Sequence, residues 1–253
     1  MGIELSHINA GIRRKQILHN VSLIARDGQV TGILGPNGCG KSTLVKTIFG
    51  IMERTSGDIL LNGKNVKDLK KRAVARAVAY VGQETHVAFD FSVLDVARMP
   101  LYGMKGIDSQ ERAYQALGVV GMQEYADRSM LTLSGGEKKL VFVAGAIAKQ
   151  TDIMILDEAT NHLDIKHQLM VLEYLRTSGK TVLMVIHDLN LASRYCDYVY
   201  LLKSGCNVAE GAPDVALSRA NVHRVFEVKG EVTKDDRGRA DFALDHLEGE
   251  LRR

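Results

Sequence analysis

Apolar and polar residues follow two different patterns along this chain of 253 residues. Short apolar stretches broken by polar turns fill the N-terminal part and predict strands. Later runs at 153–157 and 181–186 are almost continuously apolar, which is typical of strands buried on both faces of a parallel sheet. Strands are expected at residues 3–8, 17–24, 30–34, 57–62, 79–81, 153–157 and 181–186.

Helical periodicity dominates the middle of the chain. The combined pattern predicts a mixed or parallel α/β core with a helical insert of roughly 60 residues. The core is assigned to residues 1–84 and 151–228, and the helical subdomain to residues 85–150. Residues 229–253 are charged and weakly patterned, and a solvated tail is expected there. Helices are expected at residues 42–49, near 66–77, and at 93–98, 110–120 and 137–149.

Charge and hydrophobicity narrow the classes of function. The net charge of +3 is too small to favour a nucleic-acid partner, and the basic stretch 64–76 is interpreted as a solvated helix face. No run reaches the roughly 18 apolar residues that span a bilayer, and residues 1–11 do not have the pattern of a signal peptide. Any membrane role is therefore expected to come through a partner. Three cysteines without metal-binding spacing fit a reducing cytosol.

A glycine-rich loop between a predicted strand and a predicted helix carries the clearest chemical signal. It matches the phosphate-binding pattern G-x-x-x-x-G-K-[ST]. The glycines let backbone N–H groups surround phosphates, and the helix N-terminus adds a favourable dipole. Lys41 is expected to neutralise the β- and γ-phosphates of a nucleotide, and the Ser42 hydroxyl to hold Mg²⁺. The nucleotide-binding residues of this loop are Gly35, Pro36, Asn37, Gly38, Cys39, Gly40, Lys41, Ser42 and Thr43.

Two carboxylates, Asp157 and Glu158, end the apolar run at 153–157. Phosphoryl-transfer sites use one carboxylate to position Mg²⁺ and a second to polarise the attacking water. Asp157 is therefore assigned to the metal shell and Glu158 to the general base. Taken alone, the pair also fits a strand that ends in surface acids, but the phosphate-binding loop upstream favours the catalytic interpretation.

Residues 133–137 read Leu-Ser-Gly-Gly-Glu and precede a predicted helix. Ser134 and Glu137 have the spacing of a capping box. Gly135 and Gly136 leave bare N–H groups at the positive end of the helix, which suits an anion. The segment therefore predicts a helix cap that is also able to bind an anion.

This pentapeptide is similar to the signature of the ABC ATPase family, and the other motifs of that family occur in order over about residues 2–230. The resemblance implies an α/β fold, with a P-loop NTPase (RecA-like) core, an antiparallel β subdomain and an inserted α-helical subdomain. It implies hydrolysis of ATP with Mg²⁺ in a head-to-tail homodimer. In such a dimer one chain contacts the γ-phosphate held by the other through Ser134, Gly135, Gly136 and Glu137.

The resemblance also implies roles for single residues. Gln83 resembles the Q-loop glutamine, which senses Mg²⁺ and water and leads into the surface facing the membrane subunit. Residues 160–164 resemble the D-loop, whose Asp164 communicates across the dimer, and His187 resembles the switch histidine that contacts the γ-phosphate. The catalytic set is then Glu158, His187, Lys41 and Gln83, and the metal-binding set is Ser42, Gln83 and Asp157.

Some positions depart from the family pattern. The family often has an aromatic residue near its start that stacks on adenine, and this position aligns with Ile12, or with Ala10 or His7. Two arginines that are common after the signature are replaced by Leu140 and Gly145. The departures bear on nucleotide affinity, on base selectivity and on helix stability, because a glycine in mid-helix costs roughly 0.5–1 kcal/mol relative to alanine.

Cys39 lies inside the phosphate-binding loop near a helix N-terminus, where a thiolate is stabilised. Two interpretations are open: a small filler residue, or a reactive thiol whose alkylation blocks nucleotide binding and is prevented by Mg-ATP. Labelling of Cys39 followed by an ATPase assay separates the two.

Residues 92–99, 126–128 and 221–228 resemble the subfamily that serves iron-siderophore, haem and cobalamin importers. This resemblance implies a transmembrane permease dimer, an external substrate-binding protein and a peripheral location on the cytoplasmic face of the inner membrane. No nucleic-acid partner is expected.

Three apolar residues after Gln83, namely Val87, Phe89 and Phe91, are either contacts to the permease or part of the core. Two other functions stay open. A soluble ABC ATPase of DNA repair or translation also hydrolyses ATP, but the compact insert and modest charge weigh against it. A non-enzymatic nucleotide sensor is disfavoured by Glu158 and His187.

Overall fold

The computed structural model describes residues 2–13, 15–83, 89–234 and 240–244. The α-helices are α1 (Lys41–Ile48), α2 (Lys71–Ala77), α3 (Val93–Arg98), α4 (Ser109–Val119), α5 (Gly135–Ala148), α6 (Ile165–Thr177), α7 (Leu189–Tyr195), α8 (Pro213–Ala216) and α9 (Arg219–Phe226). Short 3₁₀ turns are η1 (Val66–Asp68), η2 (Met99–Leu101), η3 (Gln123–Tyr125) and η4 (Met130–Thr132). Over the described ranges, every helix is too short or too polar to traverse a bilayer.

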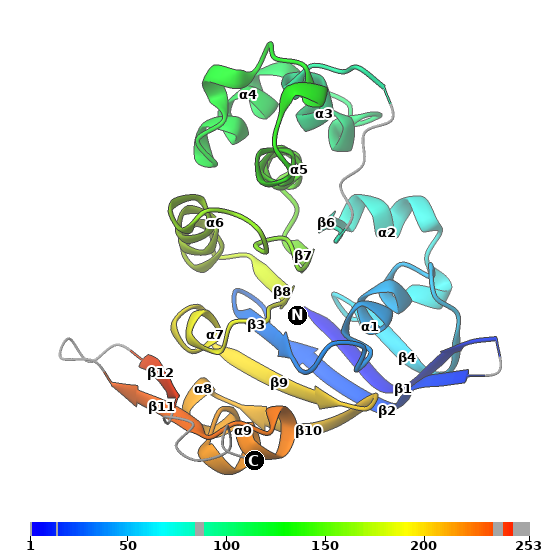
Figure 1. The fold of residues 1–253 in the computed structure, drawn as a ribbon. Coiled ribbons are helices and arrows are strands. Elements are labelled where there is room, and N and C mark those ends of the chain that lie inside the picture. Colours follow the sequence, from blue (N-terminus) through cyan, green and yellow to red (C-terminus); the bar gives the residue numbers. More distant parts are fainter. Residues whose placement is uncertain (1, 14, 84–88, 235–239, 245–253) are drawn as a thin grey trace.

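The strands belong to three sheets, and Figure 1 shows a helical lobe of α3, α4 and α5 standing at one end of the layered core. The strands are β1 (Ile3–Ile12), β2 (Lys15–Ala25), β3 (Val30–Leu34), β4 (Arg54–Leu61), β5 (Lys64–Asn65), β6 (Val78–Val81), β7 (Ile153–Asp157), β8 (Thr181–Val185), β9 (Tyr198–Lys203), β10 (Cys206–Gly211), β11 (Gly230–Lys234) and β12 (Ala240–Leu244). The expected order, a β-rich start followed by an α/β core with a helical insert, is present.

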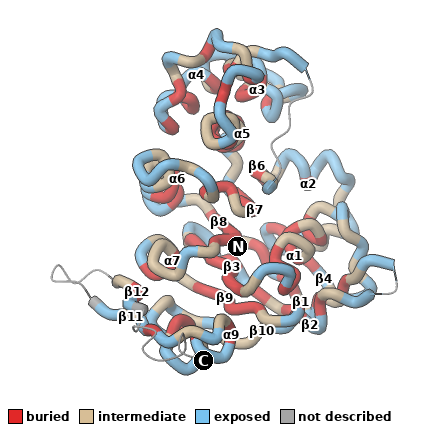
Figure 2. Tube along the Cα trace, in the orientation of Figure 1, coloured by how far each residue is buried: buried red, intermediate tan, exposed pale blue. Residues whose placement is uncertain are grey.

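The central sheet has the strand order β10-β9-β3-β8-β7-β6. Its edge strand β10 is antiparallel to β9, and all other neighbours are parallel. Side chains alternate between the faces, so Met154 and Leu156 join one apolar cluster whereas Ile153 and Ile155 join another. The two continuous apolar runs are confirmed as strands β7 and β8. Both faces of these strands are buried (Figure 2), which explains why the runs are continuously apolar.

An antiparallel sheet in the order β2-β1-β4-β5 packs with α1 against one face of the central sheet. Leu5 and Leu23 from its strands and Leu44 from α1 are fully or almost fully buried in the same cluster as Ile155 of the central sheet. This is the antiparallel part that the family resemblance implies. It brings the end of β1 and the start of β2 close to the loop that follows β3.

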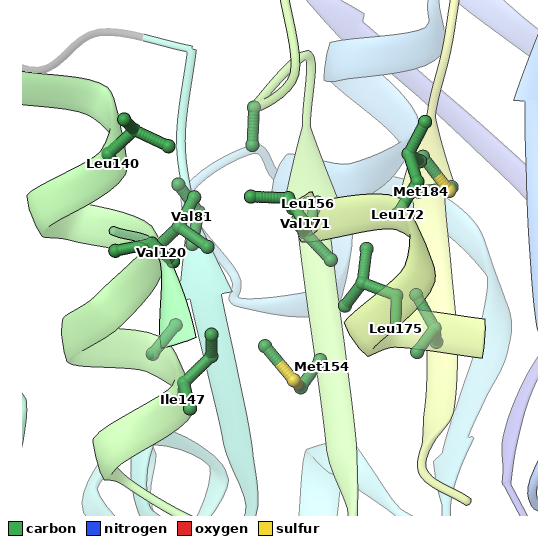
Figure 3. Close-up of a cluster of buried hydrophobic side chains, with 14 of the residues drawn as sticks. Val81, Val120, Leu140, Ile147, Met154, Leu156, Val171, Leu172, Leu175 and Met184 are labelled. Carbon is green, nitrogen blue, oxygen red and sulfur yellow. The ribbon is translucent and has the colours of Figure 1, made fainter. Parts of the chain in front are cut away.

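The opposite face is covered by α6 and α7, and α5 joins the helical lobe to the sheet. Figure 3 shows Leu140 of α5 near Val81 of β6 and Ile147 of α5 near Met154 of β7, within one continuous cluster of buried side chains. Leu172 of α6 belongs to the same cluster. The helical lobe therefore shares its core with the sheet, and α5 is the element through which the two are connected.

The prediction of one helix near residues 66–77 is wrong, because the structure has two helical segments there, separated by extended residues. The Asn65 side chain accepts a hydrogen bond from the Lys67 N–H at 3.0 Å and starts the short turn η1. Leu69 and Lys70 are then extended, with ψ near 137° and 141°, before α2 begins. Leu69 packs against the cluster beneath the antiparallel sheet. Burial of this one apolar side chain interrupts the helical pattern.

The expectation of a solvated tail is wrong for residues 230–234 and 240–244, which pair as the antiparallel strands β11 and β12. Phe242 is only 7% exposed and joins the cluster that includes the central sheet. The rest of the predicted tail after residue 244 lies outside the described residues. The exact domain boundaries proposed from the sequence stay a prediction.

Candidate functional site

The candidate catalytic residues meet at one edge of the central sheet. Strands β3, β6, β7 and β8 are parallel, so their carboxyl ends share a side of the sheet, where ligands of open α/β sheets bind. The phosphate-binding loop follows β3, Gln83 lies beyond β6, Asp157 ends β7, and His187 lies beyond β8. Residues far apart in the sequence are thus gathered by the topology alone (Figure 1).

The phosphate-binding loop requires glycine where its backbone touches other atoms. A Cβ on Gly35 would lie 2.1 Å from the Leu202 carbonyl oxygen. Gly40 has a φ of 109°, and a Cβ there would lie 2.7 Å from Leu18 Cδ2. Gly40 caps α1 without a side-chain hydrogen bond, and the first turn of α1 has no acidic residue. The N-terminus of α1 is therefore a suitable anion site.

Lys41 and Ser42 open α1 and face the loop and the end of β7. The buried Lys41 amino group donates to the carbonyl oxygens of Gly35 at 2.7 Å and Pro36 at 3.0 Å. The Ser42 hydroxyl donates to Asp157 Oδ1 at 2.9 Å. Two of the three residues expected to hold the metal, Ser42 and Asp157, are therefore in direct contact, whereas the third, Gln83, is hydrogen-bonded to Glu158.

Asp157 is fully buried, and its Oδ2 atom has no hydrogen-bond partner among the described residues. Burial raises the pKa of Asp157; the Ser42 hydrogen bond opposes this rise, and the charge of Glu158 adds to it. A buried carboxylate oxygen without a partner is costly unless a cation completes it. Because Mg²⁺ prefers hydroxyl and carboxylate oxygens, Ser42 and Asp157 fit this ion.

The Glu158 carboxylate is held by three side chains. Its Oε1 atom lies 2.5 Å from His187 Nε2, and its Oε2 atom accepts hydrogen bonds from the amides of Gln83 and Asn161, each at 3.2 Å. Glu158 also has a φ of 55°, in the left-handed region that side chains with a Cβ rarely adopt. Its carbonyl oxygen accepts a hydrogen bond from Lys139 Nζ at 2.9 Å.

Sequence reasoning misses two of these partners. Asn161 follows Glu158 by three residues inside the segment 160–164, so its proximity was open to prediction from the short loop. Lys139 carried no such signal, because two adjacent lysines at the start of a helix usually face solvent. Only the packing of α5 against the end of β7 places Lys139 under Glu158.

A cleft of about 970 Å³ opens in front of the phosphate-binding loop. Ile12 lines it and is 51% exposed, whereas Ala10 is fully buried and His7 is hydrogen-bonded to Asn20. Of the three positions aligned with the adenine-stacking residue, Ile12 is therefore the one that faces the cleft. The lining residues are Ile12, Lys15, Gln16, Ile17, His19, Asn37, Gly38, Gly40, Lys41, Ser42, Thr43, Gln83, Glu158, Ser204 and Gly205.

Several lining residues were not singled out by sequence reasoning. Lys15 and Gln16 start β2, and Ser204 and Gly205 form the turn between β9 and β10. The Gly205 N–H donates to the Cys39 carbonyl oxygen at 2.9 Å, which ties this turn to the phosphate-binding loop. Lys15 was visible in the sequence as a basic residue, but its position opposite the loop depends on the packing of two sheets.

Cys39 is buried, and burial raises the pKa of its thiol despite the positive charge of Lys41. A raised pKa lowers the thiolate fraction and with it the reactivity. The stabilised thiolate expected from the helix N-terminus is therefore wrong. A Cβ on Gly35 would lie 2.7 Å from Cys39 Sγ, so this side chain fills the inside of the loop.

Ser134 and Glu137 form the predicted capping box at the start of α5. The Ser134 hydroxyl accepts from the Glu137 N–H at 3.3 Å, and Glu137 Oε2 accepts from the Ser134 N–H at 2.8 Å. Hydrogen bonding of the Glu137 carboxylate to the side chain and to the backbone N–H of Ser134 lowers the pKa of Glu137. Ser134 and Gly135 are exposed, and a Cβ on Gly135 would meet no atom within 4 Å. Residues 134–137 do not line the cleft of their own chain.

Asp164 caps the start of α6, accepting hydrogen bonds from the His167 N–H at 3.0 Å and lying 2.6 Å from His167 Nδ1. The bond from the His167 backbone is the main reason that the pKa of Asp164 is lowered. Asp164 is exposed. It does not line the cleft in front of the phosphate-binding loop.

The apolar residues after Gln83 are at the surface where they are described. Phe89 is 71% exposed and Phe91 is 36% exposed, and their rings meet edge to face with centroids 6.2 Å apart. These two therefore do not belong to the core. Val87 lies outside the described residues.

Comparison with known proteins gives consistent matches. Residues 18–161 match the family model described as ABC transporter. The chain is 40% identical over 244 residues to the manganese transport system ATP-binding protein of Bacillus subtilis, covering 92% of this chain and 95% of that protein. It is 33% identical over 245 residues to the iron(3+)-hydroxamate import ATP-binding protein of the same organism, covering 93% and 91%.

A solved structure resembles the fold over most of the chain. This is cbiO1 from Clostridium perfringens, part of an ABC transporter complex, with a TM-score of 0.74 and 28% sequence identity. The match covers 84% of this chain and 88% of that chain. The arrangement of core, antiparallel sheet and helical lobe is therefore shared with this protein.

Proposed function

The chain belongs to the ABC transporter family and is an ATPase, and from this premise we propose that it powers import of a metal ion or metal complex as a head-to-tail homodimer. The observation that carries the proposal is the Glu158 carboxylate, held between His187 and Gln83 at the wall of the phosphate-binding cleft. Such a carboxylate is suited to orient a water molecule for attack on a γ-phosphate.

The roles of the chain's residues follow from their positions. The N-terminus of α1 and Lys41 hold the phosphates in the cleft. Ser42 and Asp157 hold magnesium, which when bound offsets the negative charge of the phosphates. Glu158 accepts the proton of the attacking water, and its contact with His187 keeps the carboxylate oriented.

The proposed site is completed by a second copy of the chain. Ser134 and Gly135 are exposed at the start of α5, where the first turn leaves the N–H groups of Gly135 and Gly136 without helical partners, yet Ser134 and Gly135 do not line the cleft of their own chain. An anion-binding helix start outside the cleft is explained if it contacts the γ-phosphate in the twin subunit. Asp164, exposed at the start of α6, is proposed to lie at the same interface. Nucleotide binding then closes the dimer, and hydrolysis reopens it.

Replacement of Glu158 by glutamine tests this function. Glu158→Gln keeps the hydrogen-bonding shape but removes the base, so turnover is expected to fall by about a hundredfold or more. The variant is expected to bind Mg-ATP and to accumulate as a dimer in size-exclusion chromatography. Glu173→Gln, the same change at an exposed residue of α6, is the control and is expected to behave as the wild type. A Glu158→Gln chain that stays monomeric at saturating Mg-ATP contradicts the shared site.

We propose that the surface after Gln83 contacts a permease. Exposed Phe89 and Phe91 support this proposal, because paired aromatic rings on a surface are typical of protein contacts. The relatives that act on manganese and on iron(3+)-hydroxamate support a cargo that is a metal ion or a metal complex, with siderophore, haem and cobalamin as the finer candidates. An external substrate-binding protein would select among them.

Isolation of the membrane protein that co-purifies with the chain, followed by metal analysis of transport in vesicles, tests the cargo. The expected result is nucleotide-dependent uptake of a metal or its chelate. A soluble ABC ATPase would show no membrane partner and no uptake.

A further inference from the structure

Lys139 is a buried lysine directly beneath the catalytic edge. Its side chain is 6% exposed, although it lies on the second turn of α5, close to the exposed Ser134 and Gly135. Its Nζ atom donates to the Glu158 carbonyl oxygen at 2.9 Å. Burial lowers the pKa of Lys139, and the charges of Glu158 and Asp157 oppose this change. Burial of a charged amino group costs free energy unless a hydrogen bond or an opposite charge compensates it.

The partner of Lys139 is an unusual piece of backbone. Glu158 has a φ of 55°, which is unfavourable for a residue with a Cβ and persists only where the surroundings hold it. This φ fixes the direction in which the side chain leaves the backbone. The carboxylate reaches His187 at 2.5 Å and the amides of Gln83 and Asn161 at 3.2 Å in this conformation.

We propose that Lys139 is a positioning residue for ATP hydrolysis, which holds the Glu158 backbone so that the carboxylate points into the cleft. The proposal rests on the catalytic role proposed for Glu158. Lys139 does not itself line the cleft, and its hydrogen bond is to the Glu158 backbone carbonyl, so it acts through the backbone. Because α5 begins with the Ser134–Gly135 turn, the same helix carries the anion-binding element and the support of the base.

A partly buried lysine at the other end of α5 provides the contrast. Lys149, just after α5, donates to the Val78 carbonyl oxygen at 2.7 Å and to the carbonyl oxygen of Ala75. Burial lowers the pKa of Lys149 as well. Ala75 and Val78, which supply its carbonyl partners, do not line the cleft. Lys149 therefore matches Lys139 in chemistry while lacking any link to Glu158.

The test compares Lys139→Met with Lys149→Met in the full chain. Lys139→Met is expected to lower kcat by about tenfold to a hundredfold, because a small displacement of a catalytic group has effects of this size. Its ATP affinity is expected to stay within about threefold of wild type, since the phosphate-binding loop is untouched. Lys149→Met is expected to lower the melting temperature but to leave kcat within about threefold. Lys139→Arg, which keeps a donor, is expected to recover part of the lost kcat.

Equal kcat for Lys139→Met and wild type overturns the proposal, and so does a loss of kcat matched by Lys149→Met. If Lys139→Met does not fold, Lys139→Leu is used with the same criteria, because it too removes the donor.

A double-variant cycle separates positioning from general structure. In the Glu158→Gln background, Lys139→Met is expected to cause no further loss of turnover, because the carboxylate it positions is already gone. A further loss equal to that of the single variant overturns the proposal. Glu158→Gln alone with wild-type turnover would instead remove the proposed function, so the two failures are distinguishable.

Discussion

Gly145 lies in the part of α5 that packs against α3 and η2. A Cβ there would lie 3.1 Å from Pro100 Cγ and 3.2 Å from the Ala97 carbonyl oxygen. Glycine within a helix lowers stability by about 0.5–1 kcal/mol relative to alanine. Here it allows α5 to lie close to Pro100 and Ala97. The arginine common at this position in the family has no room here unless the helices move apart.

Alanine substitution at two glycines separates helix propensity from packing. Gly118 lies in α4, and its added Cβ would meet only the Gln123 side chain at 3.4 Å. Gly118→Ala is expected to raise the free energy of unfolding by about 0.5 kcal/mol or more. Gly145→Ala is expected to lower it by about 1 kcal/mol, because overpacking outweighs the propensity gain.

Urea denaturation of both variants measures these changes. A stabilising Gly145→Ala would show that α5 has room at this position and would contradict the packing explanation.

The hairpin of β11 and β12 packs against α7, the helix that begins just after His187. Phe242 is buried, and Arg194 Nη2 of α7 lies 2.8 Å from Asp241 Oδ1. This ion pair is about one-third exposed on each side and contributes at most about 1 kcal/mol. The apolar contact of Phe242 therefore supplies most of the attachment.

Removal of the Phe242 ring tests the attachment. Phe242→Ala is expected to lower the free energy of unfolding by roughly 2–4 kcal/mol, since a buried aromatic side chain is lost. Hydrogen exchange in α7 is expected to become faster, because the hairpin no longer covers it. Glu231→Ala, at an exposed position of β11, is expected to change stability by less than about 0.5 kcal/mol. Unchanged exchange in α7 would mean that the hairpin does not restrain this helix.

The strands that were expected and the motif residues were predictable because their signals are local, whereas β9 and β10 of the central sheet were not among the expected strands. Continuous apolar runs identified β7 and β8, and the phosphate-binding pattern located the turn into α1. The hairpin was missed because one large apolar residue, Phe242, supplies its burial within a charged segment. The partner of Lys139 was missed for a different reason. Its contact joins residues 19 positions apart through tertiary packing, and no short-range pattern reports such a contact.

The whole molecule has two helix N-termini that are suited to bind an anion, and they face different regions. The start of α1 faces the cleft of about 970 Å³, whereas the exposed start of α5 lies outside the lining of that cleft. We propose that these two helix starts are the two halves of a nucleotide site, and that two chains join them head to tail so that each site takes one half from each copy.

Mixing two inactive variants tests this claim most directly. Lys41→Ala removes the phosphate contact of the loop, and Gly135→Asp places a negative charge at the start of α5, where an added side chain meets no atom. In a mixed dimer, one site combines an intact loop from one chain with an intact α5 start from the other. The mixture is predicted to regain about a quarter of wild-type turnover, because half of the dimers are mixed and each keeps one of two sites. A mixture no more active than the separate variants would contradict the shared site.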